Sequence, residues 1–175
     1  MSVHIIIDGY NLIRQSQALA SLDQQDMQLG REALIDMLSA YKKIRPHAIT
    51  VVFDAAGAPD FIEPQLRAKG IGIRFSRRGE SADEVIKRML AREKERALVV
   101  SSDREITRFA ETCQAAVISS EEFENRLAMA SYSAVKGAVA EGEEENGWEP
   151  TTRKKGPQRR RSKRERRNQV KLKKL

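Results

Sequence analysis

Three aspartates of this chain come directly after short apolar runs, and carboxylates are side chains that can hold a metal ion. Asp8, Asp54 and Asp103 end the segments IIID, VVFD and VVSSD. Each run has the composition of a buried strand, and the connections between runs are long enough for helices, so we expect parallel strands. The carboxyl ends of parallel strands share one edge of a sheet, where ligands bind. The three carboxylates are therefore expected to converge.

A fourth carboxylate, Asp83, lies in the segment GESADEVIKRML. The apolar spacing predicts a helix over Ala82–Glu95 with Ser81 as its cap. On that helix Asp83 lies on the apolar side, whereas Glu84 lies on the charged side, so Asp83 is the predicted ligand. Four carboxylates suit a hard cation such as Mg²⁺ or Mn²⁺, which can deprotonate a water while a phosphodiester is cut. The four aspartates together therefore predict a metal-dependent nuclease.

Each aspartate also has a plain structural explanation, because an Asp after a strand commonly caps the next helix. For any one of them that explanation is at least as good as metal binding, and only the whole set favours a site. Other chemistry has less support, since the sequence has no Cys/His zinc spacing and no Walker phosphate loop. Of the two histidines, His4 and His47, the first is expected to be structural.

The elements that would position these residues alternate between strand and helix, which predicts an α/β fold. The predicted strands are Val3–Ile7, Ile49–Phe53, Ile71–Phe75, Ala97–Ser101 and Ala115–Ile118. The predicted helices are Leu29–Ile44, Ala82–Glu95, Arg104–Cys113 and Glu121–Met129. Asp-Gly at 8–9 predicts a turn, and residues 55–64 predict a loop that is followed by a short helix.

The chain divides by charge as well as by pattern. Residues 151–175 hold thirteen Lys and Arg against one Glu, a charge of +12, whereas residues 1–150 have a charge of −5. A length of 175 residues allows one domain with an extension. We expect a folded domain at 1–133, an acidic linker at 134–150 and a basic tail at 151–175 that is disordered when free.

The sequence also predicts a compartment. The single Cys113 leaves no internal disulfide and is typical of a reducing environment. The start MSVHIIIDGYN lacks a basic region, and its apolar run ends too early for a signal peptide. No run approaches the length that spans a membrane. A cytoplasmic protein without a membrane partner is expected.

The acidic segments resemble a known family. DGYNLI, VVFDA, GESADEVI and SSDREI, with the later SSEEF, are similar in order and spacing to the motifs of the YacP-like NYN domain. That family is a bacterial branch of the PIN-like ribonucleases, and the resemblance covers roughly residues 3–130. It implies a PIN-like three-layer fold with a central parallel sheet of order 3-2-1-4-5, counting the predicted strands along the chain. It also implies a metal-dependent endoribonuclease.

By this resemblance Asp8, Asp83 and Asp103 are catalytic and metal-site residues, and Asp54 is a further metal ligand. Asn11 matches the asparagine of the first motif and is also expected at the catalytic centre. It would orient Asp8 or hydrogen-bond the scissile phosphate, with capping of the first helix as the structural alternative. Some relatives act on messenger RNA at the ribosome, so the resemblance implies the ribosome as a further partner.

Basic residues are the candidate RNA contacts. Arg77 and Arg78 lie on the loop SRRGE, near where an RNA backbone would enter, although a solvated charged loop is an equally good interpretation. In the tail, Arg159, Arg160 and Arg161 are expected to attach RNA or the ribosome, because dense positive charge releases counterions from nucleic acid. An inert, solubilising tail is the alternative.

The function that these residues predict is a metal-dependent endoribonuclease that cuts single-stranded RNA. The alternative is a noncatalytic RNA-binding or ribosome-associated factor that keeps the fold. Loss of acidic positions would favour that alternative, and here all four remain. A phosphatase or a receiver-like domain has less support, because the first strand ends in DGYN without a second carboxylate nearby.

Overall fold

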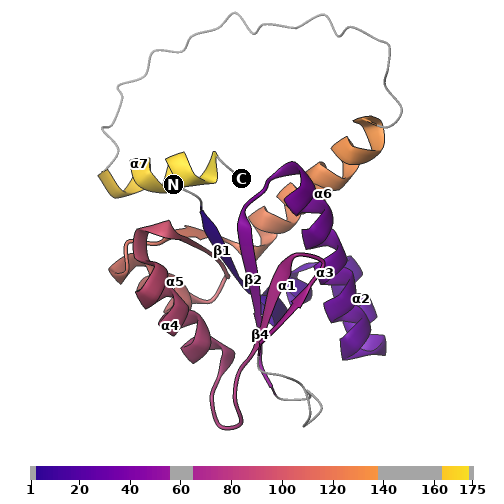
Figure 1. Ribbon diagram of the computed structural model, residues 1–175, viewed down its shortest axis with the longest axis horizontal. Coiled ribbons are helices and arrows are strands. Elements are labelled where there is room, and N and C mark those ends of the chain that lie inside the picture. Colours follow the sequence, from indigo (N-terminus) through magenta and orange to yellow (C-terminus); the bar gives the residue numbers. More distant parts are fainter. Residues whose placement is uncertain (1–2, 56–64, 138–162, 174–175) are drawn as a thin grey trace, which may run out of the picture.

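A computed structural model of the chain describes residues 3–55, 65–137 and 163–173 (Figure 1). Within these residues one sheet lies between two layers of helices. The strands are β1 (His4–Asp8), β2 (Ala48–Phe53), β3 (Gln65–Ala68), β4 (Ile71–Phe75), β5 (Ala97–Val100) and β6 (Ala116–Ile118). The helices are α1 (Gly9–Gln15), α2 (Gln17–Gln25), α3 (Met27–Ile44), α4 (Ala82–Glu93), α5 (Arg104–Thr112), α6 (Ser120–Gly137) and α7 (Lys163–Leu172), with a 3-10 turn at Lys94–Arg96. None of these helices is long and apolar enough to cross a membrane.

The sheet has the strand order β3-β4-β2-β1-β5-β6 and is parallel except for the edge strand β3. Its five parallel strands are the predicted ones, and their order is the 3-2-1-4-5 that the resemblance implied. β1 is central, since Asp8 pairs with Val52 of β2 and Ile7 pairs with Val100 of β5. The carboxyl ends of β1, β2 and β5 are therefore neighbours.

The sixth strand, β3, was not predicted. A short helix was expected before Ile71, and that expectation is wrong, because Gln65–Ala68 pairs antiparallel with β4. The reason is the two-residue connection at Lys69 and Gly70, whose φ angles of 51° and 81° reverse the chain as in a tight hairpin. The hairpin, rather than the exposed residues of β3 themselves, determines this strand.

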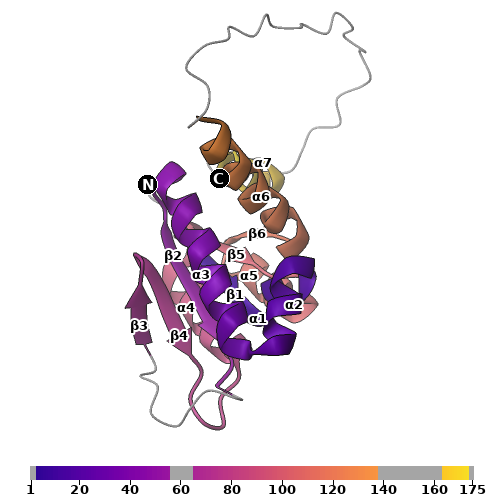
Figure 2. The same ribbon diagram turned by 90° about the vertical axis from the view of Figure 1, so that its right-hand side faces the viewer.

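Different helices cover the two faces of the sheet. α1, α2, α3 and α6 lie on one side, and α4 and α5 lie on the other (Figure 2). The side chains of β1 alternate accordingly: Ile5 and Ile7 pack in the first core, and Ile6 packs in the core beneath α4 and α5. Asp8 comes two residues after Ile6, and Asp54 comes two residues after Val52, which packs in the same core. Because side chains alternate along a strand, both aspartates lie on the α4 side of the sheet.

The first helix begins directly after Asp8. The predicted turn at Asp8–Gly9 is wrong, because Asp8 is the N-cap of α1 and Gly9 is its first residue. Gly9 is packed so closely that a Cβ atom there would lie 2.3 Å from the ring of Phe53. A residue without a side chain therefore lets α1 start against the sheet, which fixes the backbone on both sides of Asp8.

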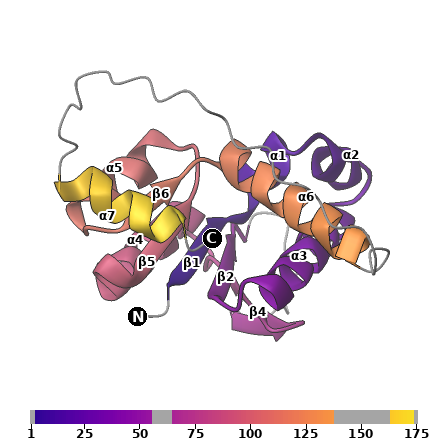
Figure 3. The same ribbon diagram turned by 90° about the horizontal axis from the view of Figure 1, so that it is seen from above.

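Within the segment for which a disordered tail was expected, Lys163–Leu172 form helix α7. α7 packs against the edge strand β6 (Figure 3). The Asn168 amide pairs with the Val117 backbone: Val117 N donates to Oδ1 at 3.0 Å, and Nδ2 donates to Val117 O at 3.4 Å. Arg126 Nη1 also donates to Leu172 O at 2.6 Å. These anchors are polar, so an apolar pattern in the sequence did not reveal the helix.

Candidate active site

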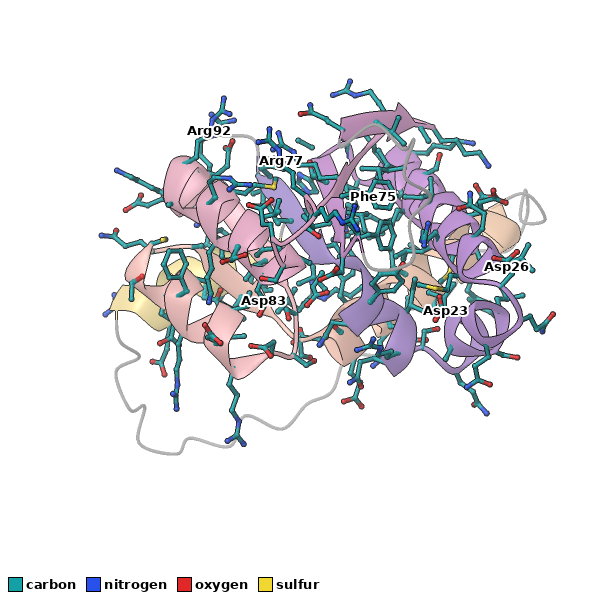
Figure 4. All side chains as sticks on the ribbon, turned by 90° about the horizontal axis from the view of Figure 1, so that it is seen from below. Asp23, Asp26, Phe75, Arg77, Asp83 and Arg92 are labelled. Atoms are coloured by element: carbon teal, nitrogen blue, oxygen red, sulfur yellow. The ribbon has the colours of Figure 1, made fainter. Side chains whose placement is uncertain are left out.

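The structure brings the four predicted aspartates to one edge of the sheet. Asp8 ends β1, Asp54 follows β2 and Asp103 follows the neighbouring β5. Asp83 lies in the first turn of α4, which packs on these three strands. Figure 4 looks onto this edge and shows Asp83 at the start of α4. The charges of Asp83 and Asp103 raise the pKa of Asp8, and the charges of Asp103 and Asp54 raise the pKa of Asp83. The four carboxylates therefore lie in one region.

Asp8 is a partly buried carboxylate that two hydrogen bonds hold in place. Its Oδ1 accepts from the backbone N of Asn11 at 3.2 Å, and its Oδ2 accepts from Ser101 Oγ at 3.3 Å. The pKa of Asp8 is raised from 3.8 to about 6, mainly by burial and also by the charges of Asp83 and Asp103, although both hydrogen bonds lower it. A cation beside this carboxylate would therefore favour its ionised form.

Ser101 connects Asp8 to Asp103 and was not among the predicted site residues. Only 1% of it is exposed, and its hydroxyl donates to Asp8 and accepts from the backbone N of Asp103 at 3.1 Å. Asp103 in turn caps α5, since its Oδ1 accepts from the backbone N of Glu105 at 2.6 Å and of Ile106 at 3.1 Å. Its Oδ2 accepts no hydrogen bond from the residues that the structure describes. The serine two residues before Asp103 was a signal that could have predicted this turn.

Asp83 is partly buried and Glu84 is exposed, as the helical spacing predicted. Burial raises the pKa of Asp83, the charge of Asp103 raises it further, and Lys87 lowers it. Lys87 itself forms an ion pair with Glu105. The exposed Glu84 instead accepts from the backbone N of Ser81 at 2.9 Å and completes a capping box at the start of α4.

Asp54 lies between β2 and the start of α4. Its Oδ2 accepts from the backbone N of Ala82 at 3.4 Å. The buried Ser76, directly after β4, connects to the residues on both sides of Asp54. The backbone N of Ser76 donates to Phe53 O at 3.0 Å. The Oγ of Ser76 accepts from the backbone N of Ala55 at 2.9 Å. Asp54 is therefore fixed beside the helix that carries Asp83.

The side chain of Asn11 joins two loops of the site. Its Oδ1 accepts from the backbone N of Ser102 at 3.0 Å and from Ser120 Oγ at 2.6 Å. Ser120 is fully buried, and its backbone N donates to Ser102 Oγ at 3.2 Å. Asn11 orients Asp8 through its backbone N–H, and the cap of α1 is Asp8 rather than Asn11. A contact between Asn11 and the scissile phosphate stays a prediction.

The oxygen atoms of this edge fit Mg²⁺ or Mn²⁺ in their chemistry. Carboxylate oxygens are hard ligands, and Mg²⁺ is usually bound through one or two carboxylates while it keeps several waters. Within residues 3–55, 65–137 and 163–173, no group of three or more His, Cys, Asp or Glu side chains is arranged to hold an ion by itself. Two carboxylates, with waters and substrate phosphates as the other ligands, are the arrangement that fits these residues.

The predicted RNA contacts fall into two groups. Arg77 and Arg78 are exposed on the loop between β4 and α4, at the edge that carries the aspartates. In Figure 4 Arg77 lies between Arg92 of α4 and Phe75 of β4. Arg159, Arg160 and Arg161 lie outside the described residues.

The raised pKa of Asp8 predicts how the stability of the metal-free protein depends on pH. The folded state binds the Asp8 proton more tightly than the unfolded state, so stability should fall as pH rises from about 4 to about 6. This shift corresponds to up to about 3 kcal/mol, which Asp8→Asn should remove. Urea unfolding in EDTA should show the stability advantage of Asp8→Asn growing across this window. A difference that does not vary with pH would contradict the prediction.

The order of the parallel strands, with acidic side chains at the carboxyl ends of the central ones, is the arrangement that the resemblance to PIN-like nucleases implied. Comparison with protein families leads to the same class. The chain belongs to the YacP-like NYN domain family, whose family model matches residues 5–174. NYN domains are part of the PIN-like nuclease superfamily, so a nuclease-type function related to RNA follows from this membership.

Individual relatives agree in fold. The curated protein YacP of Bacillus subtilis (strain 168), described as uncharacterized, is 27% identical over 85 residues. That match spans 49% of each chain, so the chain covers about half the length of this relative. The crystal structure of Rae1 (YacP) from Bacillus subtilis is similar with a TM-score of 0.66 and 22% identity, over 79% of this chain and 80% of that one. A mutant form of the same protein gives a TM-score of 0.64 and 21% identity, over 79% and 85% of the two chains.

Proposed function

We propose that the chain is a divalent-metal-dependent endoribonuclease that hydrolyses phosphodiester bonds in single-stranded RNA. The observation that carries this proposal is the group of four carboxylates at one sheet edge, where burial and repulsion raise the pKa of Asp8 and of Asp83. Such repulsion destabilises a protein unless a cation neutralises it, and perturbed carboxylates gather at functional sites. Membership of a nuclease family supports RNA as the substrate and Mg²⁺ or Mn²⁺ as the cofactor.

In this proposal the protein positions charges before the substrate arrives. Ser101 fixes Asp8 relative to Asp103, and α4 brings Asp83 to the same edge. A bound Mg²⁺ or Mn²⁺ would supply an activated water and neutralise charge on the phosphate. Because backbone N–H groups hold Asp8, Asp54 and Asp103, and a buried hydroxyl also holds Asp8, these three carboxylates need little reorganisation during the reaction.

The substrate side of the site would be polar and basic. Arg77 and Arg78 would contact phosphates next to the cleaved bond, which positions RNA without reading its sequence. The Nδ2 of Asn11 donates to no side chain or backbone oxygen among the described residues, and it would donate to the phosphate. These three groups would hold the strand while the aspartates act.

The decisive measurement is the cleavage of a labelled single-stranded RNA by wild-type protein and by Asp8→Asn and Asp103→Asn proteins, with Mg²⁺, Mn²⁺ or EDTA present. Internal cuts that require the metal and the aspartates would support the proposal. The noncatalytic alternative, an RNA-binding or ribosome-associated factor, requires that RNA be bound and left intact in every sample.

Neutralising the tail should weaken attachment to RNA without stopping the chemistry. In a protein with Arg159, Arg160 and Arg161 changed to Gln, each lost phosphate contact should remove about 0.7 from the slope of log affinity against log salt. Fluorescence anisotropy of labelled RNA over a salt series measures that slope, and purified ribosomes in place of RNA test the second proposed partner. The cleavage rate at saturating RNA should stay at the wild-type value, since α7 and the aspartates are retained. An unchanged slope would show that these three arginines do not contact RNA phosphates.

A further inference from the structure

On the face that carries α4, the more open part of the sheet is the one formed by β4 and β3. On this face α4 packs on β1, β2 and β5. The register identifies the residues beyond it: Thr50 of β2 pairs with Gly72 of β4, and Gly72 pairs with Arg67 of β3. Arg74 pairs with Val52, whose side chain lies beneath α4, so Arg74 has the same orientation. Gly72 and Arg74 are only partly buried, and Arg67 is exposed.

A pocket of about 390 Å³ lies on this open face. Its lining includes His4, Thr50, Gly72, Arg67 and Arg74, whose strand positions put them on this face. Lys42 of α3 also lines the pocket from the hairpin end, where its Nζ donates to Gly70 O at 2.6 Å. Its described lining contains no carboxylate. Gly72 keeps the space open, because a Cβ atom there would come within 3.1 Å of Thr50 Oγ1.

The two arginines of this pocket are not neutralised within the protein. Elsewhere on the surface, Lys69, Arg88 and Arg126 each form an ion pair with a carboxylate. The side chains of Arg67 and Arg74 form neither an ion pair nor a hydrogen bond among the residues that the structure describes. They therefore form a local positive surface on a body, residues 1–150, whose charge is −5.

The pocket lies on the same side of the sheet as the aspartates. His4 and Asp8 are the two ends of β1, and four residues of strand correspond to about 13 Å. Along β4 the chain runs from Arg74 toward the exposed Arg77 at the aspartate edge. One extended polyanion several residues long can therefore contact the pocket, then Arg77 and then the aspartates.

We propose that this pocket binds a backbone phosphate of the RNA strand whose scissile phosphate lies at the four aspartates. The choice of RNA rests on the function proposed above. A phosphate supplies the negative charge that the lining lacks, and arginine binds it through two parallel hydrogen bonds. Such a contact holds the strand in register without selecting a sequence. The pocket thus makes the protein favour RNA long enough to span both places.

The test measures RNA binding in EDTA, where no metal-dependent cleavage takes place. Arg67→Gln combined with Arg74→Gln should lower the slope of log affinity against log salt by about 1.4, which is about 0.7 for each lost contact. The matched control combines Arg14→Gln with Arg108→Gln, two exposed arginines outside the pocket, and should keep the wild-type slope. Arg67→Lys with Arg74→Lys keeps the charge and should also keep the slope, which separates charge from packing. A dinucleotide is too short to span both places, so changing the two arginines should alter its affinity far less than that of the longer RNA.

Equal slopes for the pocket variant and the wild type would overturn the proposal, and so would an equal loss in the control variant. The outcome is independent of catalysis. If the wild type binds RNA with the expected difference in slopes but never cuts it, the endoribonuclease proposal fails and the phosphate pocket stands. If metal-dependent cleavage takes place and the slopes are equal, the pocket proposal alone fails.

Discussion

RNA cleavage by the Asp8→Asn and Asp103→Asn proteins is expected to fall at least about a hundredfold while both proteins stay folded. Loss of a metal's stabilisation of transition-state charge is worth several kcal/mol, and each 1.36 kcal/mol is a factor of ten in rate. The folds should survive because Asn caps helices about as well as Asp. The backbone bonds from Asn11 to position 8, and from Glu105 and Ile106 to position 103, can therefore be kept.

A control with the same chemical change makes this result specific. Asp26 caps α3 with a hydrogen bond from the backbone N of Gln28 at 2.7 Å, and it is exposed and apart from the aspartate edge. Asp26→Asn should keep the wild-type rate, and circular dichroism should show that all three variants are folded. If the folded Asp8→Asn and Asp103→Asn proteins both cut RNA at full rate, the assignment of these carboxylates is wrong.

Substitutions at the adjacent residues Asp83 and Glu84 of α4 should have very different effects on RNA cleavage. Asp83→Asn is expected to lose metal-dependent cleavage by a similar factor, because it removes a carboxylate that accepts no hydrogen bond from the described residues. Glu84→Gln should stay near wild type, since Gln can replace Glu in the capping box with Ser81. Neighbours on a helix are about 100° apart, so only one of the two carboxylates faces the site.

A second measurement checks the Asp83 variant without using activity. Removing the Asp83 charge should lower the pKa of Asp8, because that charge is one cause of its rise to about 6. An NMR titration of the metal-free protein would report the change. Loss of cleavage in Glu84→Gln rather than in Asp83→Asn would show that the helical phase is wrong.

The sequence predicted the elements whose formation depends on local apolar pattern. Ile5, Ile6 and Ile7 are all fully buried, and a continuous apolar run of this kind is typical of a central parallel strand. The strand β3 and the helix α7 were missed for a different reason. β3 forms because a hairpin brings exposed residues to β4, and α7 is held by Asn168 on the backbone of a strand fifty-one residues earlier. Neither contact leaves a local apolar pattern.

The candidate site shows the same division. The aspartates could be predicted because strand ends and helix starts place them. The connections between them could not, since Ser101 bonds to Asp8 across 93 positions and Ser102 bonds to Asn11 across 91. Such pairs become neighbours only when β1 and β5 lie side by side. Asn11 was expected to orient Asp8 or to contact the scissile phosphate, and in the structure its backbone N–H donates to Asp8.

The capping roles of Asp8 and Asp103 bear on how this sequence can change in evolution. An asparagine at either position would start the helix equally well and would remove a charge that its neighbours repel. Fold stability therefore gives selection no reason to keep a carboxylate there, and random substitution would lead toward the amide. The carboxylate at position 8, whose charge burial and neighbouring carboxylates disfavour, is thus explained by the proposed chemistry and not by the stability of the fold.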